Sequence, residues 1–229
     1  MNAPAQDLTE DALRQQVIAT SLAMNALGIN QGKSGNVSAR FHDGYLITPT
    51  GLPYDQTKSE DIVFMRQDQP GDTIRDEPDF LRRAPSSEWR FHRDIYARYP
   101  DVNAIVHTHS VHAAALACLR RSIPAFHYMV AVAGGRDIRC APYATFGTQQ
   151  LSDNALGALQ DRKACLLANH GAIATGPTLA QALDLAVEVE TLAHMYLLAL
   201  QIGEPALLGD EEMAIVVEKF LSYGRAPRP

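Results

Sequence analysis

The chain has 229 residues, a net charge of −6 and a sequence isoelectric point near 5.7. This length suits one α/β domain with a sizeable core over residues 1–229. The acidic balance argues against a basic surface for nucleic acid or an anionic membrane, although backbone amides can still bind a phosphate locally. The polar, acidic start of the chain does not resemble a secretory signal, and no apolar run approaches the ~20 residues of a membrane helix.

Three cysteines are scattered along the chain: Cys118, Cys140 and Cys165. Their number is odd and their spacing is not that of a metal site. Reduced thiols of this kind are typical of the cytoplasm, and we therefore expect a cytoplasmic protein.

The first third of the chain predicts a helix over residues 7–28. Asp7 and Glu10 have the spacing of a capping box at its start, and Gly28 can end it. Four apolar residues are expected on its buried side: Leu13, Val17, Leu22 and Leu27.

A hairpin and a strand follow. Residues 34–51 predict two short strands joined at Asp43 and Gly44. Residues 62–65 predict another strand. The stretch 66–85 is rich in charge and contains prolines, which indicates an exposed loop. It is not a domain boundary, because candidate site residues lie on both sides of it.

The rest of the chain alternates between helical and extended patterns. Helices are predicted over 87–99, 111–120, 148–160, 178–202 and 210–221. Strands are predicted over 103–108, 127–132, 137–142 and 164–168. Pro100 stops the first of these helices, and Pro177 and Gly203 flank the longest. The mixture predicts an α/β fold with three α/β/α layers around a central mixed, mostly antiparallel sheet.

Three histidines form a candidate metal site. His107 and His109 follow the apolar stretch 104–106, and residues two apart in a strand face the same side. His170 precedes Gly171, which would let the backbone turn sharply beside a ligand. Three histidines leave a coordination position open, as in a catalytic zinc site. The simpler alternative is a pair of ordinary histidines near a strand end. The remaining histidines are expected to be structural or solvent-facing: His42, His92, His112, His127 and His194.

Glu88 follows Ser86 and Ser87 at the predicted start of a helix. The simpler interpretation is an N-cap, in which a serine hydroxyl accepts a hydrogen bond from a backbone amide and the acidic residue faces the positive helix end. The functional interpretation uses the same geometry. The serines and the free amides can hold a phosphate, while Glu88 reaches a metal or acts as a base.

Two tight turns carry further polar groups. Gly35 and Asn36 precede a predicted strand, and Thr50 and Gly51 end another. Each turn alone is ordinary. Their short side chains and accessible amides nevertheless also suit an oxyanion.

Several segments together resemble the class II aldolase/adducin family: SGNVSAR, LITPTG, PSSEWRFH, VHTHS, IPAFHYM, CAPYATFGT and LLANHG. The resemblance runs from about residue 8 to residue 224. The combination is far more specific than a single His-x-His pair. The loop at 66–85 is longer than the family's usual connection, and nothing is carried over onto it.

The resemblance implies a zinc site of His107, His109 and His170. Glu88 would be a fourth ligand in the empty enzyme and the catalytic acid/base once substrate displaces it. The family's phosphate-binding positions match Gly35, Asn36, Thr50, Gly51, Ser86 and Ser87. Three aromatic residues also match family positions: Tyr128, Phe146, which would position the aldehyde half, and Tyr223, which would close the site. Tyr128 would reach a neighbouring subunit's site and protonate the aldehyde oxygen, which implies the family's usual homotetramer.

The reaction that the resemblance implies is the reversible cleavage of a ketose 1-phosphate, of the L-fuculose 1-phosphate kind, to dihydroxyacetone phosphate and an aldehyde. A Lewis acid can stabilise the enediolate charge, and Glu88 can move the proton on the dihydroxyacetone carbon. The aldehyde tail stays open, with 5-deoxyribulose and 5-methylthioribulose 1-phosphate as alternatives. A ribulose-phosphate 4-epimerase typically has aspartate at the Glu88 position. A dehydratase, a decarboxylase and a non-enzymatic adducin-like module are the remaining alternatives.

Overall fold

The central element of the fold is a seven-stranded sheet with the order β3–β2–β1–β4–β7–β6–β5. The computed structural model describes residues 9–68 and 83–222. The strands are β1 (Asn36–Phe41), β2 (Gly44–Ile47), β3 (Val63–Arg66), β4 (Ala104–Thr108), β5 (Cys140–Ala141), β6 (Ala164–Leu167) and β7 (Gly171–Gly176). Neighbouring strands are antiparallel except β5 and β6, which run parallel. The expected mixed, mostly antiparallel sheet is therefore confirmed.

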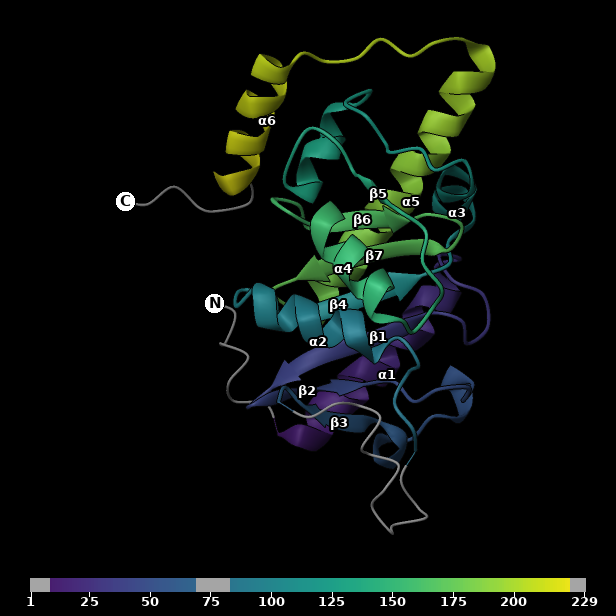
Figure 1. Cartoon of the computed structure of the whole chain (residues 1–229), viewed down its shortest axis with the longest axis vertical. Coiled ribbons are helices and arrows are strands. Elements are labelled where there is room, and N and C mark those ends of the chain that lie inside the picture. The colour runs from purple at the N-terminus through teal and green to yellow at the C-terminus, as the bar shows by residue number, and fades with distance from the viewer. Residues whose placement is uncertain (1–8, 69–82, 223–229) are drawn as a thin grey trace.

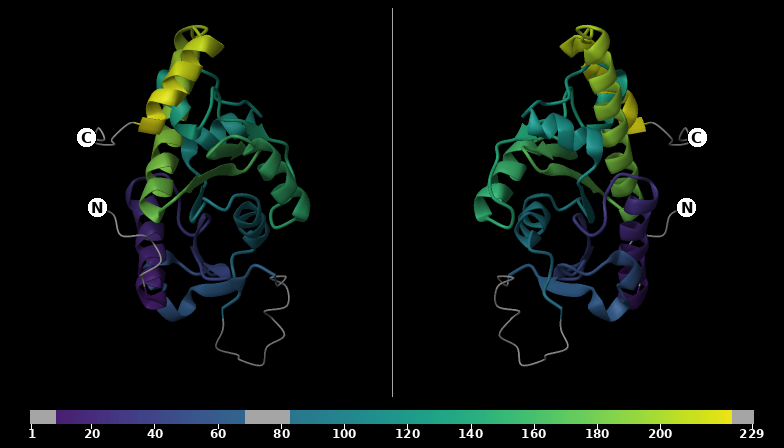
Figure 2. Two further views of the ribbon diagram at one scale, coloured as in Figure 1. Left: turned by 90° about the vertical axis from the view of Figure 1, so that its left-hand side faces the viewer. Right: turned by 90° about the vertical axis from the view of Figure 1, so that its right-hand side faces the viewer.

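Helices cover both faces of this sheet (Figure 1). The α-helices are α1 (Glu10–Ala26), α2 (Trp89–Arg98), α3 (Val111–Cys118), α4 (Gln149–Ala158), α5 (Leu179–Ile202) and α6 (Asp210–Ser222). Short 3₁₀ helices are η1 (Tyr54–Gln56), η2 (Ser59–Asp61) and η4 (Tyr128–Ala133). One apolar core lies between the sheet and α1, α3 and α5, and a second lies between the sheet and α2 and α4. Figure 2 shows the sheet between these layers, which confirms the three-layer α/β/α fold.

Successive side chains of β4 point to opposite faces of the sheet, so they enter the two cores in turn. Ala104 and Val106 join the core that contains α1, α3 and α5, whereas Ile105 joins the core that contains α2 and α4. His107 has the parity of Ile105 and contacts the ring of Phe91 on α2. The predicted direction of the His107 side chain therefore follows from the strand period.

The first helix begins later than predicted. Its first residue is Glu10, and its N-cap is Thr9, whose hydroxyl accepts a hydrogen bond from the Ala12 amide at 3.3 Å. Asp7, the cap suggested by the sequence, lies outside the described residues. The predicted end is confirmed, because Gly28 follows the helix with a φ of +72°.

The buried face of α1 is partly as predicted. Leu13 and Val17 are buried, but Leu22 is 41% exposed and Leu27 is 55% exposed. The buried stripe advances in steps of three or four residues from Val17 to Met24, and Leu22 falls beside it. Leu27 is the C-cap, beyond the last helical residue. The assignment of these two leucines to the core was wrong.

The predicted strand at 127–132 is wrong, because this segment forms the 3₁₀ helix η4. The His127 side chain caps it by accepting a hydrogen bond from the Met129 amide at 3.3 Å, and Gly134 ends it with a φ of +93°. The predicted strand at 137–142 shrinks to the two residues of β5. The segment 127–132 is mostly apolar, but it forms a 3₁₀ helix that the His127 side chain caps.

The sequence missed β7, which lies in the centre of the sheet between β4 and β6. All six of its residues are buried. The segment is made largely of alanine and glycine, which have low strand propensity. Pairing on both edges, rather than propensity, therefore fixes β7 as a strand.

The helix α5 is long and apolar enough, by length and composition, to cross a membrane. On those criteria the expectation that no such run exists was wrong. In this fold α5 packs against β4, β7 and α3, and it buries Leu185, Val189 and Leu192. Its composition is therefore accounted for by its place as the core helix of one layer.

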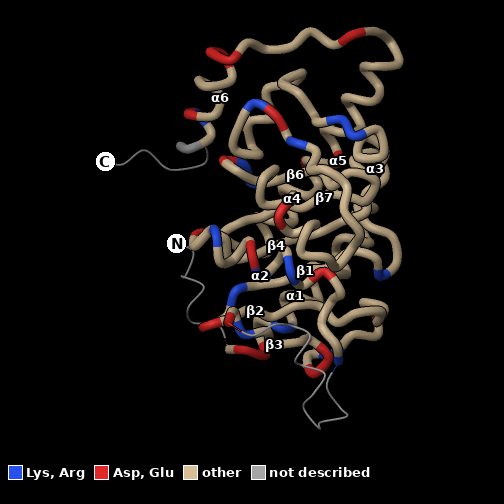
Figure 3. The backbone as a smooth tube through the Cα atoms, viewed as in Figure 1, with Lys and Arg blue, Asp and Glu red and all other residues tan. Residues whose placement is uncertain are grey.

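Acidic and basic residues are interspersed along the chain (Figure 3). Examples of ion pairs are Arg162 with Asp137 at 2.7 Å and Arg83 with Asp61 at 2.8 Å. Exposed pairs contribute only about 0–1 kcal/mol each. Of the predicted loop at 66–85, residues 69–82 lie outside the described residues. The two apolar cores, rather than surface charge, therefore account for most of the fold's stability.

Candidate active site

Four side chains from three parts of the fold converge at one end of β4. His107 is in β4, His109 lies just beyond its end, and His170 is in the turn between β6 and β7. Glu88 is the N-cap residue of α2. Because β7 pairs with β4, the β6–β7 turn brings His170 beside the histidine pair.

The potential ligand atoms of these four residues are close enough to share one ion. Nε2 of His107 lies 3.1 Å from Nε2 of His109 and 3.1 Å from Oε2 of Glu88. Nε2 of His170 lies 3.3 Å from Oε1 of Glu88, and all four ligand atoms are within 4.8 Å of one another. Ligands held at about 2.0–2.1 Å around a tetrahedral ion lie roughly 3.3 Å apart. The donor set therefore fits a metal ion.

The protonation of the cluster also suits a cation. Nδ1 of His107 donates to the Ala172 carbonyl at 3.0 Å, which leaves its Nε2 lone pair facing the cluster. Burial lowers the pKa of His109 and His170 to about 4 each, so both imidazoles are neutral near pH 7. Burial alone would raise the pKa of Glu88, but His107, His170 and a hydrogen bond from Asn36 outweigh it and hold this pKa at about 2. The cluster thus places the neutral imidazoles of His109 and His170 beside the Glu88 carboxylate.

The turn that carries His170 differs from its predicted form. Asn169, not Gly171, takes the left-handed conformation, with a φ of +55°. Gly171 begins β7, and a Cβ there would lie 2.2 Å from the Thr108 carbonyl oxygen and 3.1 Å from Cδ2 of His109. Glycine is therefore needed at 171 for close approach of β7 to β4, and the sharp turn is made one residue before His170.

The candidate phosphate loops lie side by side. The Thr50 amide donates to the Ala84 carbonyl at 3.0 Å, and the Ser86 amide donates to the Thr48 carbonyl at 3.0 Å. The Lys33 ammonium donates to the Gly51 carbonyl at 2.7 Å and so ties the loop before β1 to the loop after β2. The segments that contain Gly35, Asn36, Thr50, Gly51, Ser86 and Ser87 are thereby brought together.

The structure bears on the two interpretations of Glu88. The Glu88 amide donates to the Ser86 hydroxyl at 3.3 Å, but Glu88 itself is the N-cap residue of α2, and no side chain forms a cap hydrogen bond there. The Glu88 carboxylate forms no cap hydrogen bond and is only 5% exposed. It faces His107 and His170 instead. The N-cap position and a place in the metal cluster are therefore compatible.

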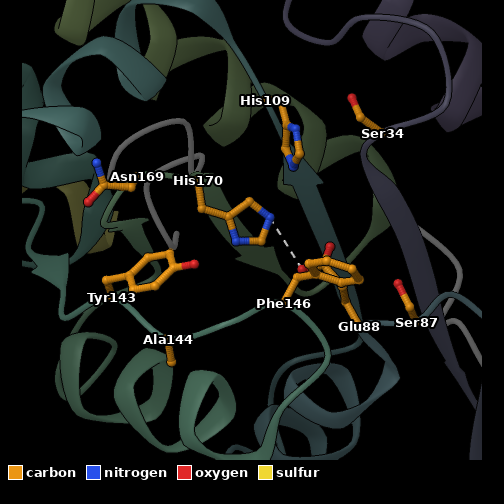
Figure 4. Close-up of a pocket in the computed structure, with 9 residues that line it drawn as sticks. All are labelled: Ser34, Ser87, Glu88, His109, Tyr143, Ala144, Phe146, Asn169 and His170. Atoms are coloured by element: carbon orange, nitrogen blue, oxygen red, sulfur yellow. Dashed lines mark ion pairs between the residues drawn. The ribbon is translucent and has the colours of Figure 1, made fainter.

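A pocket of about 260 Å³ opens beside the cluster. Its lining residues are Ser34, Ser87, Glu88, His109, Tyr143, Ala144, Phe146, Asn169 and His170 (Figure 4). Phe146 is 65% exposed, and in the view of Figure 4 the Tyr143 hydroxyl points towards the His170 imidazole. Sequence reasoning did not assign Tyr143, although it stands three residues before Phe146 in the same motif. The pocket lining therefore combines serine hydroxyls and aromatic rings with the candidate metal ligands.

One of the predicted aromatic residues, Tyr128, does not line this pocket. Tyr128 is half-exposed, and its ring lies parallel to the ring of Phe220 on α6, with centroids 6.4 Å apart. Tyr128 is not among the residues that line the pocket of its own chain. Tyr223 lies outside the described residues. A role for Tyr128 would therefore require a neighbouring chain.

His92 was expected to be structural, and it is fully buried. Its ring nevertheless contacts Asn36, which contacts Glu88. The spacing of Glu88 and His92, four residues apart at the start of a helix, was a signal that both share one face. His112 lies apart from this site, 2.7 Å from a Glu190 carboxylate oxygen and stacked on His194.

Comparisons with known proteins agree with this geometry. The profile of the class II aldolase and adducin N-terminal domain matches residues 15–197. A 5-methylthioribulose-1-phosphate/5-deoxyribulose-1-phosphate aldolase of Rhodospirillum rubrum is 54% identical over 213 residues, covering 93% of each chain. The L-fuculose phosphate aldolase of Escherichia coli K12 is 51% identical over 218 residues, covering 95% of this chain and 98% of the relative.

Solved structures agree as well. A structure of L-fuculose 1-phosphate aldolase superposes with a TM-score of 0.84 at 38% identity. The match covers 95% of this chain and 99% of the other. The family profile, the fold and relatives above 50% identity over nearly the full length all lead to one family. This chain belongs to the class II aldolase and adducin N-terminal domain family.

Proposed function

We propose that this protein is a zinc-dependent aldolase that reversibly cleaves a ketose 1-phosphate, of the L-fuculose 1-phosphate kind, to dihydroxyacetone phosphate and an aldehyde. The observation that carries the proposal is the convergence of Glu88, His107, His109 and His170 beside an open pocket. Relatives at 54% and 51% identity are named as aldolases of ketose 1-phosphates. The same donor set would be without purpose in a non-enzymatic module.

In this proposal the three imidazoles hold zinc, and Glu88 is the fourth ligand until substrate displaces it. Bound zinc supplies a Lewis acid for the negative charge that develops on the dihydroxyacetone half. Glu88 then exchanges the proton on the dihydroxyacetone carbon. Its partners outweigh the effect of its burial and keep the carboxylate ionised, which is the form that can accept a proton.

The phosphate is held where the three loops meet. The residues that would bind it are Gly35, Asn36, Thr50, Gly51, Ser86 and Ser87, through hydroxyl groups and through backbone amides other than those of Thr50 and Ser86, which donate between the loops. Backbone hydrogen bonds already tie these loops together, so binding would require little reorganisation. Fixing the phosphate remote from the scissile bond would convert its binding energy into positioning.

The aldehyde half would lie near Phe146 and Tyr143, the two aromatic residues that line the pocket. Tyr128 would protonate the aldehyde oxygen from a neighbouring subunit of a homotetramer, and Tyr223 would help to close the site. The exposure of Tyr128, away from its own pocket, is consistent with this division between chains. We further propose that the enzyme works in the cytoplasm.

A second candidate substrate is 5-methylthioribulose or 5-deoxyribulose 1-phosphate. The Rhodospirillum rubrum relative, named for both, matches as well as the Escherichia coli fuculose phosphate enzyme does. These substrates share the phosphate and dihydroxyacetone half and differ only in the aldehyde tail. The residue at 88 is glutamate, not the aspartate typical of the related epimerases, which favours cleavage over epimerisation.

The test is a coupled assay for dihydroxyacetone phosphate, in which its reduction consumes NADH. L-fuculose, 5-deoxyribulose and 5-methylthioribulose 1-phosphates would be supplied in turn to zinc-loaded protein. We expect cleavage of at least one, abolished by a chelator and restored by zinc. Absence of dihydroxyacetone phosphate with all three, in protein with a full complement of zinc, would reject the proposed reaction.

A further inference from the structure

A continuous line of hydrogen-bonded side chains runs from Glu88 into the core between β1 and α2. Asn36 Nδ2 donates to Glu88 Oε2 at 2.9 Å, and Asn36 Oδ1 lies 2.5 Å from His92 Nε2. His92 Nδ1 lies 2.7 Å from the Ser38 hydroxyl, which lies 2.8 Å from the Tyr96 hydroxyl. All five side chains are at most 5% exposed. Of the five side chains in this line, only Glu88 lies at the surface of the pocket.

The regular periods of two elements create this line. Glu88, His92 and Tyr96 are spaced by four residues, so they share one face at and along α2. Asn36 and Ser38 are spaced by two in β1 and face the same side of the sheet. The two sets interleave across the interface between helix and sheet, and each polar group meets a partner from the other element.

The direction of every hydrogen bond in the line follows from the Glu88 carboxylate at one end of it. A carboxylate only accepts, so Asn36 must present its amide nitrogen to Glu88 and its oxygen to His92. That oxygen only accepts, so His92 carries its proton on Nε2. Burial lowers the pKa of His92 to about 3, so the ring is neutral and Nδ1 accepts from Ser38. Ser38 has then used its proton, and Tyr96 donates to Ser38.

The two oxygens of Glu88 are consequently not equivalent. Oε2 accepts a hydrogen bond from Asn36 and lies 3.1 Å from Nε2 of His107, whereas Oε1 forms no hydrogen bond with the described residues and lies 3.3 Å from Nε2 of His170. Aligned hydrogen bonds also polarise one another, so a proton donor as distant as Tyr96 strengthens the bond that Asn36 makes to the carboxylate.

We infer that Asn36, His92, Ser38 and Tyr96 form a positioning line that fixes Glu88 through Oε2 and leaves Oε1 as the oxygen that exchanges a proton with substrate. The inference rests on the proposed aldolase reaction. Asn36 touches Glu88 directly, whereas the other three residues act through it. Loss of a distant member should therefore slow proton transfer without weakening substrate binding.

The chain offers a matched pair of variants for the test. Tyr96→Phe removes the terminal hydroxyl of the line. Tyr45→Phe makes the same chemical change in a fully buried tyrosine, whose ring centroid lies 5.2 Å from that of Tyr96 and whose hydroxyl donates to the Trp89 carbonyl outside the line. We expect Tyr96→Phe to lower kcat by about 3- to 10-fold with KM and zinc content unchanged. We expect Tyr45→Phe to stay within about two-fold of wild type.

A second pair tests the middle of the line. Glutamine at position 92 keeps one donor and one acceptor, whereas leucine keeps only the volume. We expect His92→Gln to retain much of the kcat that His92→Leu loses. If His92→Leu does not fold, the two tyrosine variants still decide the question. Equal kcat in Tyr96→Phe and Tyr45→Phe would overturn the inference.

A measurement without substrate separates this inference from the proposed function. In metal-free protein labelled with ¹⁵N-histidine, His92 should give the NMR pattern of a neutral ring protonated on Nε2. The Nδ1 resonance should move in Tyr96→Phe and stay in place in Tyr45→Phe. A proton on Nδ1, or the same shift in both variants, would reject the line whatever the enzyme cleaves. A correct NMR pattern in a protein that cleaves no ketose 1-phosphate would reject the proposed reaction and, with it, the role given to Oε1.

Discussion

The close approach of β7 to β4 predicts that Gly171→Ala disrupts the metal cluster. A Cβ at residue 171 would lie 2.2 Å from the Thr108 carbonyl oxygen, and real Cβ contacts are essentially never shorter than 3.0 Å. The obstacle is backbone, so a rotamer change cannot relieve it. The two strands must therefore separate by roughly 1 Å, in keeping with the cost of overpacking a buried site.

The magnitude follows from the geometry of the site. His109 follows β4 and His170 precedes Gly171, so the separation moves two metal ligands apart. Metal sites tolerate deviations of only about 0.2 Å in ligand distance. We expect zinc affinity to fall by at least about 10- to 100-fold, as when groups that orient ligands are lost. Unfolding free energy should fall by about 1–3 kcal/mol.

The assay is competition for zinc against a chromophoric chelator, with thermal unfolding of the metal-free protein measured in parallel. The control is Gly157→Ala in α4, where a Cβ meets nothing within 4 Å. Alanine there should stabilise the helix by about 0.5–1 kcal/mol and leave zinc affinity unchanged. Wild-type zinc affinity in Gly171→Ala would refute the argument that strand spacing sets the ligand geometry.

Four further outcomes are expected. His109→Ala should lose most of its metal in elemental analysis, and full retention with unchanged activity would reject it as a ligand. Glu88→Gln should keep the fold and bind metal while losing about 10²–10⁴-fold in cleavage rate, whereas a rate within a few-fold of wild type would leave it as a helix cap only. Mixing Tyr128→Phe with Glu88→Gln subunits should restore activity, because some sites would combine intact groups from two chains. If subunit exchange is verified by mass spectrometry and no activity returns, the shared site is contradicted. A monomer in light scattering would contradict it as well. The pKa of His92 falls from its ordinary 6.5 to about 3 on folding, so below pH 6.5 the unfolded chain binds a proton that the folded chain does not. The unfolding free energy of the metal-free protein should therefore drop by about 2 kcal/mol from this residue between pH 7 and pH 5, and His92→Gln should lessen the drop in denaturant titrations.

Much of the site could be predicted because its signals are local. The apolar residues before His107 predict a strand, and the strand period then places His107 and His109 on one side. The serines before Glu88 predict a helix start at that residue. Those inferences need only neighbouring residues. The structure places the side chains of His107, His109 and Glu88 together.

Other features could not be predicted because they depend on partners remote in sequence. β7 is a strand because β4 and β6 pair with its two edges, although its alanines and glycines do not favour one. Leu22 lies off the buried stripe of α1 by a rotation too small for an apolar pattern to resolve. Residues 127–132 are mostly apolar and were predicted as a strand, yet they form a 3₁₀ helix capped by His127.

The sequence by itself determined the layered α/β class, the three histidines and Glu88 as candidates, and the resemblance that joined them. Only the tertiary structure decided which oxygen of Glu88 accepts the hydrogen bond from Asn36. It also assigned Gly171 to close strand contact and placed Tyr128 away from the pocket of its own chain. The physical reason is that hydrogen-bond direction and steric clearance belong to pairs of groups. Asn36 and His92, or Gly171 and Thr108, meet only after helix, strand and turn have packed.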